Sequence, residues 1–117
     1  MIKILVDTNS LIYFFDNKTD LYSLFDRHFS EPFSFYTISP CLEELKRMGR
    51  KEVIKWADVS GIKTWEATNV GRVDDNILDI AKKEKLAVIS EDRALVSRAK
   101  SAGIKVFKIG GMGISET

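Results

Sequence analysis

The order of hydrophobic and polar positions along the chain predicts alternating strands and helices. Ile2–Val6 is a short apolar run rich in β-branched residues that ends at an acidic residue, which is typical of a buried strand. Similar runs predict strands at Phe33–Ile38, Leu86–Ile89 and Ile104–Ile109. Because helical segments separate these strands, the strands are expected to run parallel. The pattern therefore predicts an α/β fold, a three-layer sandwich in which helices cover both faces of a central, mostly parallel sheet.

Apolar residues spaced three and four positions apart predict the intervening helices. Their buried faces are expected to consist of Leu11, Ile12, Phe14 and Phe15; Leu21, Leu24, Phe25, His28 and Phe29; Leu42, Leu45 and Met48; Val53, Ile54 and Ala57; and Ile77, Leu78, Ile80 and Ala81. The residues expected to cap three of these helices are Thr8 or Asn9, Ser39 (followed by Pro40), and Asp74. A last helix is predicted over Asp92–Ala102 and ends before Gly103.

The length of the chain indicates one domain. The chain has 117 residues, which is the usual size of a single domain, and a formal net charge of +1. Residues 1–110 are expected to form this domain, and the glycine-rich residues 111–117 a flexible tail.

A net charge near zero argues against a protein that coats nucleic acid through electrostatics alone. It does not argue against an enzyme that acts on nucleic acid, because carboxylates at a metal site lower the formal charge.

Cysteine and histidine are too scarce for two common kinds of site. With one cysteine, Cys41, and one histidine, His28, the chain has neither an internal disulfide nor a structural zinc site of cysteine and histidine ligands. Cys41 is expected to be a small buried residue in a reducing compartment, and His28 a partly buried structural residue. No apolar run suits a secretory signal or a membrane span, so a soluble cytoplasmic protein is expected.

Acidic residues occur at positions that a parallel sheet would bring to one edge. Asp7 follows the first predicted strand, and Asp92 follows the strand at Leu86–Ile89. In open parallel sheets, ligands bind outside the carboxyl ends of the strands. The other acids expected near this edge are Glu43 and Glu44, in the helix after Ile38, and Asp74 and Asp75, at the start of a later helix. Such a cluster is costly without a cation, and its oxygen ligands suit Mg²⁺, which can assist phosphodiester hydrolysis.

Each of these acids also has a purely structural interpretation. Asp7 and Asp92 are well placed to cap the helices that follow them. The two acidic pairs can belong to solvated helix faces or can stabilise a helix dipole. No single acid decides between these interpretations, whereas the complete ordered set indicates a metal site.

Four segments of the chain, in this order, resemble the PIN-domain ribonuclease family, in particular its small single-domain VapC-like and archaeal members. The segments are ILVDTNSLIY, SPCLEELKR, VDDNILDIAKKEKLAVIS and EDRALVSRAKSAGIKVF. The resemblance extends from Ile2 to Ile109 and implies a PIN-like three-layer fold. The family has an acid after its first strand, a Glu-Leu pair in a helix, an acid opening a later helix, and a hydroxyl-x-Asp after the next strand. These features fall on Asp7, Glu44-Leu45, Asp74 or Asp75, and Ser90-Glu91-Asp92.

The resemblance assigns roles to these acids. The catalytic residues that it implies are Asp7, Glu44, Asp74, Asp75 and Asp92, of which Asp7, Asp74 and Asp92 would hold Mg²⁺ or Mn²⁺. Glu44 is preferred to Glu43 because a leucine follows it directly. Asp74 is preferred to Asp75, but both precede an apolar helix residue by three positions, so this choice stays open.

The resemblance also implies supporting roles for polar residues near the acids. Asn9 and Ser90 are expected to orient an acid or a bound water. Ser90 stands where the family frequently has threonine and retains the hydroxyl, whereas Glu91 adds a charge that has no assigned role. Arg72 and Arg93 lie close to the acidic segments in the sequence and are expected to bind RNA phosphates.

The function implied by the resemblance is that of a metal-dependent endoribonuclease that hydrolyses single-stranded RNA. Such an enzyme is either the toxin of a toxin–antitoxin pair, with an antitoxin protein as partner, or an RNA-processing nuclease. Similar small proteins are commonly homodimers, and no membrane partner is expected. The main alternative is a non-catalytic PIN-like module that binds RNA or protein, which the complete acid set disfavours. A second alternative is a phosphohydrolase of the haloacid dehalogenase type, which needs an Asp-x-Asp motif. Asn9 stands in the place of the second acid of this motif, which disfavours that class.

Overall fold

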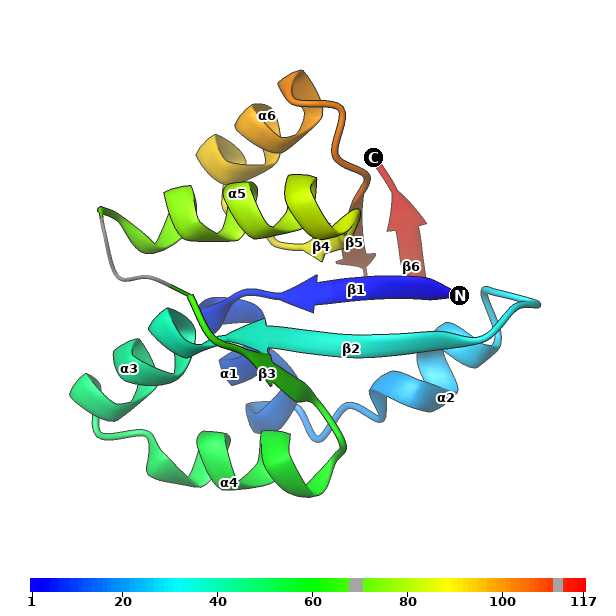
Figure 1. Ribbon diagram of the computed structural model, residues 1–117. Coiled ribbons are helices and arrows are strands. Elements are labelled where there is room, and N and C mark those ends of the chain that lie inside the picture. The colour runs from blue at the N-terminus through cyan, green and yellow to red at the C-terminus, as the bar shows by residue number, and fades with distance from the viewer. Residues whose placement is uncertain (68–70, 111–112) are drawn as a thin grey trace.

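A central sheet organises the fold, and the computed structural model describes residues 1–67, 71–110 and 113–117. Within these residues the sheet has six strands in the order β3-β2-β1-β4-β5-β6. The strands are β1 (Ile2–Val6), β2 (Phe33–Ile38), β3 (Lys63–Trp65), β4 (Ala87–Ile89), β5 (Val106–Gly110) and β6 (Gly113–Glu116). All neighbouring pairs from β3 to β5 are parallel, and β6 is antiparallel to β5 (Figure 1). The expected α/β fold is confirmed.

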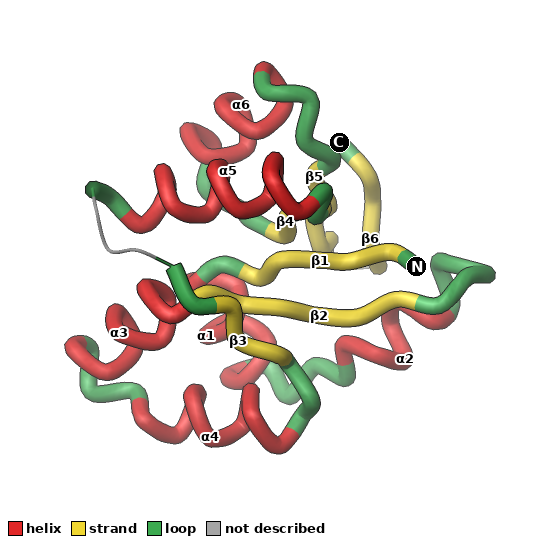
Figure 2. The backbone as a smooth tube through the Cα atoms, viewed as in Figure 1, coloured by secondary structure: helices red, strands yellow, loops and turns green. Residues whose placement is uncertain are grey.

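Helices cover both faces of this sheet. They are α1 (Thr8–Asp16), α2 (Leu21–Asp26), α3 (Ser39–Arg47), α4 (Lys51–Val59), α5 (Val73–Glu84) and α6 (Arg93–Ser101). The helices α1 to α4 lie on one side of the sheet, and α5 and α6 lie on the other (Figure 2). No helix among the described residues is both long and apolar enough to span a membrane.

The strands supply one core to each face of the sheet because their side chains alternate in direction. Ile4 and Val6 point into the core beneath α1 to α4, whereas Leu5 points into the core beneath α5 and α6. The first core contains a cluster of aromatic rings around Phe25. The ring of Phe25 lies 5.1 Å from that of Phe35 and 5.9 Å from that of Phe107. This cluster fixes the short helix α2 against the sheet.

Three helix starts differ from the sequence expectation. Asp7, rather than Thr8 or Asn9, caps α1, and its side chain accepts a hydrogen bond from the Ser10 amide at 2.9 Å. Helix α3 already begins at Ser39, and the hydroxyl of Ser39 instead accepts a hydrogen bond from the Ala67 amide at 3.0 Å.

Helix α5 begins one residue before Asp74, so Asp74 lies in its first turn and is not its cap. An aspartate in this turn still interacts favourably with the helix dipole. The last helix, α6, is confirmed where it was expected, and Gly103 follows its end with a φ of +77°.

Two residues that were expected on buried helical faces are exposed. Helix α2 ends at Asp26, so His28 lies beyond it and is exposed, although its ring contacts that of Phe29 at 4.8 Å. Met48 is 55% exposed. It lies six positions after Leu42, and six residues of an α-helix rotate the side chain to about 120° away from the starting face. The chain also leaves the helix there, since Gly49 adopts a φ of +73°.

Two strands were not predicted. The segment that contains β3 shows no alternation, because Lys63 and Thr64 are exposed and only Trp65 is half-buried. The expectation of a flexible tail is wrong for Gly113–Glu116, which forms β6 and pairs with β5 from Phe107 to Gly110. Residues 111 and 112 of the expected tail lie outside the described residues.

We predict that Phe25→Ala lowers the free energy of unfolding by about 3–5 kcal/mol, because it leaves a cavity inside the aromatic cluster. The exposed Met48 provides the matched control, and Met48→Ala should change this free energy by no more than about 0.5 kcal/mol. Urea unfolding followed by circular dichroism measures both values. Equal effects of the two substitutions would contradict the placement of these side chains.

Candidate active site

The carboxyl ends of β1, β2 and β4 lie side by side at the centre of the sheet. Strand β1 pairs with β2 on one side and with β4 on the other, and Val6 lies opposite Ile89. The chain moves outward from β1 through β2 to β3 and then crosses back to β4, so the strand order switches between β1 and β4. Ligands of open α/β sheets bind at such a switch point. In Figure 1 the arrowheads of β1 and β2 point to this end of the sheet, where α5 begins.

Asp7 lies at this switch point, directly after β1, and is only 6% exposed. Its Oδ1 accepts a hydrogen bond from the Ser10 amide at 2.9 Å, and its Oδ2 accepts one from the Ser90 hydroxyl at 2.6 Å. Burial raises the pKa of Asp7 above its ordinary value, the two serines oppose this shift, and the charge of Asp74 adds to it. The structure therefore holds a buried carboxylate in a fixed orientation at the edge of the sheet.

Ser90 connects Asp7 with Asp92. While the Ser90 hydroxyl donates to Asp7, its oxygen accepts a hydrogen bond from the Asp92 amide at 3.1 Å. The Asp92 carboxylate caps α6, because its Oδ1 accepts hydrogen bonds from the Ala94 and Leu95 amides at 2.9 and 3.1 Å. Ser90 was expected to orient an acid or a bound water, and its hydroxyl donates to Asp7. The interpretation of Asp92 as a helix cap is correct.

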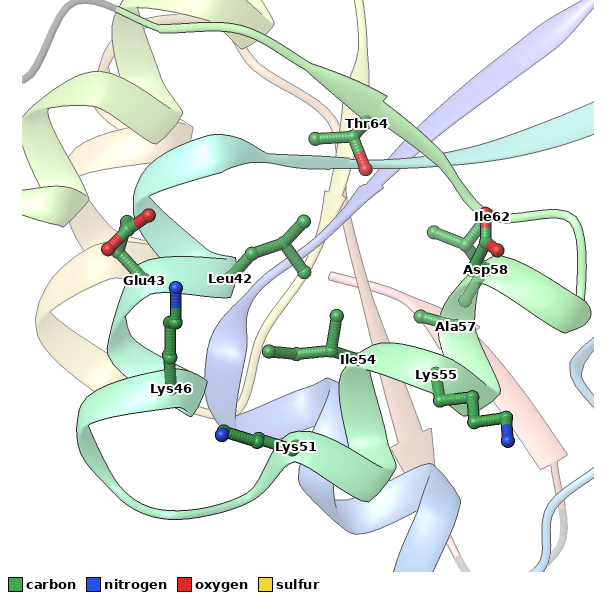
Figure 3. A pocket seen from close by; sticks show the side chains of 10 residues that line it. All are labelled: Leu42, Glu43, Lys46, Lys51, Ile54, Lys55, Ala57, Asp58, Ile62 and Thr64. Carbon is green, nitrogen blue, oxygen red and sulfur yellow. The ribbon is translucent and has the colours of Figure 1, made fainter.

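The structure distinguishes Glu44 from Glu43. Glu44 is half-buried, and its Oε1 accepts a hydrogen bond of 2.5 Å from the hydroxyl of Thr8, the residue that follows Asp7. Glu43 is exposed and lies on the rim of a separate cavity of about 540 Å³ between α3, α4 and β3 (Figure 3). Of this pair, Glu44 is therefore the acid that lies at the edge with Asp7.

Asp74 is a further carboxylate at this edge. It is half-buried, and partial burial is the main cause that raises its pKa. The negative charges of Asp92 and Glu44 raise it further, whereas the guanidinium groups of Arg72 and Arg98 act in the opposite direction. Asp74 therefore lies within electrostatic reach of both Asp92 and Glu44.

Asp75 faces a different environment from Asp74. Its Oδ1 forms an ion pair of 2.6 Å with the guanidinium of Arg98, and this hydrogen bond lowers the pKa of Asp75. The pair is partly exposed to solvent on both sides. Asp75 is therefore engaged by a cation of the protein itself, while Asp74 faces the other acids.

Two further expectations can be compared with the geometry. Asn9 is exposed, and the hydrogen bonds to the Asp7 carboxylate come from Ser10 and Ser90. Sequence reasoning missed Thr8, whose hydroxyl donates to Glu44, and Ser10, whose backbone amide donates to Asp7. A hydroxyl residue directly after an acid that ends a strand is a usable signal, whereas a backbone amide is present in almost every residue type and gives none. Of the two arginines expected to bind RNA, both are exposed, and Arg72 lies close enough to lower the pKa of Asp74. Arg93 opens α6, directly after Asp92.

The carboxylates fit a divalent cation that keeps part of its water shell. In the described part of the chain, no three aspartate, glutamate, histidine or cysteine side chains form a ready-made metal site, so Asp7, Asp74 and Asp92 do not make a closed cage. Mg²⁺ is usually held by only one or two carboxylates plus waters and substrate phosphate. A carboxylate has about four acceptor sites, and the two hydrogen bonds to Asp7 use one on each oxygen. Asp7 can therefore accept a cation without losing its orientation.

The chain is similar in sequence to a known ribonuclease, although no model of a protein family matches it. Ribonuclease VapC4 of Methanocaldococcus jannaschii is 28% identical over 119 residues, which cover 93% of this chain and 91% of that protein.

Solved structures show the same fold. The structure of the PIN domain endonuclease Utp24 has a TM-score of 0.84 at 18% identity, and the match covers 97% of this chain and 90% of that chain. A PilT N-terminus domain protein from the archaeon Sulfolobus solfataricus has a TM-score of 0.64 at 12% identity, covering 92% of this chain and 87% of that chain. The chain has the PIN-domain fold, and the resemblance identified from the sequence is confirmed.

We predict that Asp7 makes the metal-free protein less stable at neutral pH than in mild acid. Because the folded-state pKa of Asp7 is raised, its protonation favours folding. This contribution is fully present below the unfolded pKa and is lost as the pH rises through the folded pKa. Asp7→Asn removes the charge and should melt higher than wild type at about pH 7 in EDTA, with a smaller difference at about pH 5.

Asp75→Asn is the control for this experiment, because it also removes one negative charge but at a carboxylate whose pKa is lowered, by its hydrogen bond from Arg98. Its contribution to stability is present above the unfolded pKa, so Asp75→Asn should not raise the melting temperature at neutral pH. An identical pH dependence of melting in wild type and Asp7→Asn would contradict the electrostatics described for Asp7.

Proposed function

We propose that this protein is a metal-dependent endoribonuclease that hydrolyses phosphodiester bonds of single-stranded RNA. The observation that carries the proposal is the buried Asp7 carboxylate, held by two hydrogen bonds at the switch point of the sheet. Burial of a charge without a partner cation is costly, and a site of this kind is better explained by ligand binding than by stability. The name of the relative VapC4, a ribonuclease, supports the same activity.

Asp7, Asp74 and Asp92 are the residues that would hold Mg²⁺ or Mn²⁺, with Glu44 beside them. Their carboxylate oxygens are the hard ligands that these cations prefer. When bound, the cation would supply the positive charge that activates water and neutralises the phosphate.

The side chains of the protein itself contribute orientation and charge. Ser10 and Ser90 keep the Asp7 carboxylate in place, and Thr8 holds Glu44 against the same edge. Glu44 is the acid that we expect to orient or deprotonate the attacking water. Arg72 supplies a positive charge beside Asp74 and is suited to bind a phosphate of the RNA.

The biological setting is a further part of this proposal. The VapC name of the 28% identical relative supports a toxin held by an antitoxin protein, and an RNA-processing nuclease is the other role open to such an enzyme. We expect a homodimer in either case. A non-catalytic binding module is less well supported, because such a module has no need for a buried acid surrounded by further acids.

The purified protein should cleave single-stranded RNA in Mg²⁺ or Mn²⁺ and stop in EDTA. Asp7→Asn should lower kcat by at least about a hundredfold while the variant remains folded. Gel analysis of end-labelled RNA with and without EDTA measures both effects. Cleavage that persists in excess EDTA would exclude the metal mechanism, and cleavage at the wild-type rate by Asp7→Asn would exclude the site.

Metal binding provides a readout that does not depend on the choice of RNA. Only the folded state presents the assembled acids, so Mn²⁺ should raise the melting temperature of wild type. At a Mn²⁺ concentration of 100 times the Kd, the free energy of unfolding should increase by about 2.7 kcal/mol. Asp7→Asn should respond less. A protein that shows neither this response nor cleavage, but still binds RNA, would be the non-catalytic module.

Paired substitutions test which acid of each pair serves the site. Glu44→Gln should lower kcat at least about tenfold more than Glu43→Gln, and Asp74→Asn at least about tenfold more than Asp75→Asn. Each pair removes one charge from adjacent positions of the same helix, so general effects of charge cancel. Steady-state cleavage rates of the four variants measure the difference, and a reversed order within a pair would reassign that role to its neighbour.

A further inference from the structure

A small cavity of about 190 Å³ lies next to the acid edge and is separate from the cavity in Figure 3. It is enclosed by one face of α1, the carboxyl end of β4 with the residues after it, and β5. Its walls are almost wholly apolar and include Tyr13, Ile89 and Ile109. Tyr13 is 48% exposed, which makes it one of the few large apolar side chains on the surface of the described residues.

Two residues that line this cavity lie next to the hydrogen bonds of Asp7. Ser10 lines the cavity, and its amide donates to the Asp7 carboxylate. Glu91 also lines the cavity and directly follows Ser90, whose hydroxyl donates to the other oxygen of Asp7. The cavity is therefore lined by residues that adjoin both hydrogen bonds of the Asp7 carboxylate.

The chemistry of the cavity suits one nucleobase. An apolar wall with an exposed tyrosine offers a surface on which a base can stack. The volume is below the range of about 300–1,000 Å³ typical of sites for larger ligands, so it matches a single flat ring system.

A carboxylate at the cavity specifies the kind of base. The Oε1 atom of Glu91 accepts a hydrogen bond from the Ile109 amide at 3.3 Å, which holds the exposed carboxylate across the space between β4 and β5. A carboxylate repels phosphate but accepts hydrogen bonds from amino groups of bases, as in pairs with the N4 amino group of cytosine. Uracil has an oxygen at this position and offers no such donor.

We propose that this cavity is a base-binding subsite that selects a base with an exocyclic amino group, through stacking on Tyr13 and a hydrogen bond to Glu91. The inference rests on the proposed function, because the cavity would bind a base of the RNA whose phosphate is cleaved at the acid edge. It also gives a role to Glu91, which the resemblance to PIN-domain ribonucleases leaves without one.

Binding of short single-stranded oligonucleotides of cytidine and of uridine tests the subsite. We expect the full-length protein to bind the cytidine oligonucleotide at least about fivefold more tightly in EDTA, measured by fluorescence anisotropy. Glu91→Gln should bring this ratio close to one. Tyr13→Ala should weaken binding of both oligonucleotides at least about fivefold, whereas Tyr13→Phe, which keeps the ring, should restore it.

Glu116→Gln is the matched control, because it removes one exposed carboxylate at β6, away from the cavity, and should leave the ratio unchanged. Equal affinities of wild type for the two oligonucleotides, no binding of either, or an unchanged ratio in Glu91→Gln would each overturn the subsite. The measurement needs no cleavage, so the two proposals can fail separately. Base-selective binding without metal-dependent cleavage would reject the nuclease and keep the subsite, and cleavage without base selectivity would do the reverse.

Discussion

The hydrogen bonds to the buried Asp7 carboxylate are the interaction on which the arrangement of the site depends. A carboxylate that is 6% exposed is costly to bury unless donors replace the lost water. One donor is the Ser10 amide, which reaches Asp7 only if α1 begins directly after β1. The other is Ser90, 83 residues away, which reaches Asp7 only if β4 lies beside β1. The strand order and the position of α1 are therefore requirements of the site as well as of the core.

The sequence was sufficient to predict those elements that bury side chains. Strands β1 and β2 lie at the predicted residues, because each is a continuous apolar run inside a sheet covered on both faces. Strands β3 and β6 were not predicted, since they lie at the two edges and carry mainly exposed or half-buried residues. Backbone hydrogen bonds to a neighbouring strand hold such edge strands, and these bonds leave no pattern of polar and apolar residues in the sequence.

The position of the candidate site was likewise predictable, because parallel strands bring the acids that follow them to one edge. The orientation of the two acids within each adjacent pair could not be predicted. Asp75 is turned toward Arg98, which lies 23 residues later, and this leaves Asp74 as the residue of the pair that faces the other acids. Glu44 is held by Thr8, which lies 36 residues earlier. Such contacts between distant segments have no local signal. The preference for Glu44 and Asp74 therefore came from the resemblance to the family and not from the pattern of polar and apolar residues.

The separation of Asp7 and Ser90 in the sequence has a consequence for the order in which the site is synthesised and folded. A contact across 83 residues forms only after the intervening chain has closed a long loop, and contacts of this kind form late in folding. During translation, β1 leaves the ribosome long before β4, and the chain between them has to be synthesised first. An unfinished chain therefore lacks the Ser90 hydroxyl that orients Asp7. For the proposed nuclease, this order of assembly leaves the set of acids incomplete until the chain has been synthesised beyond Ser90.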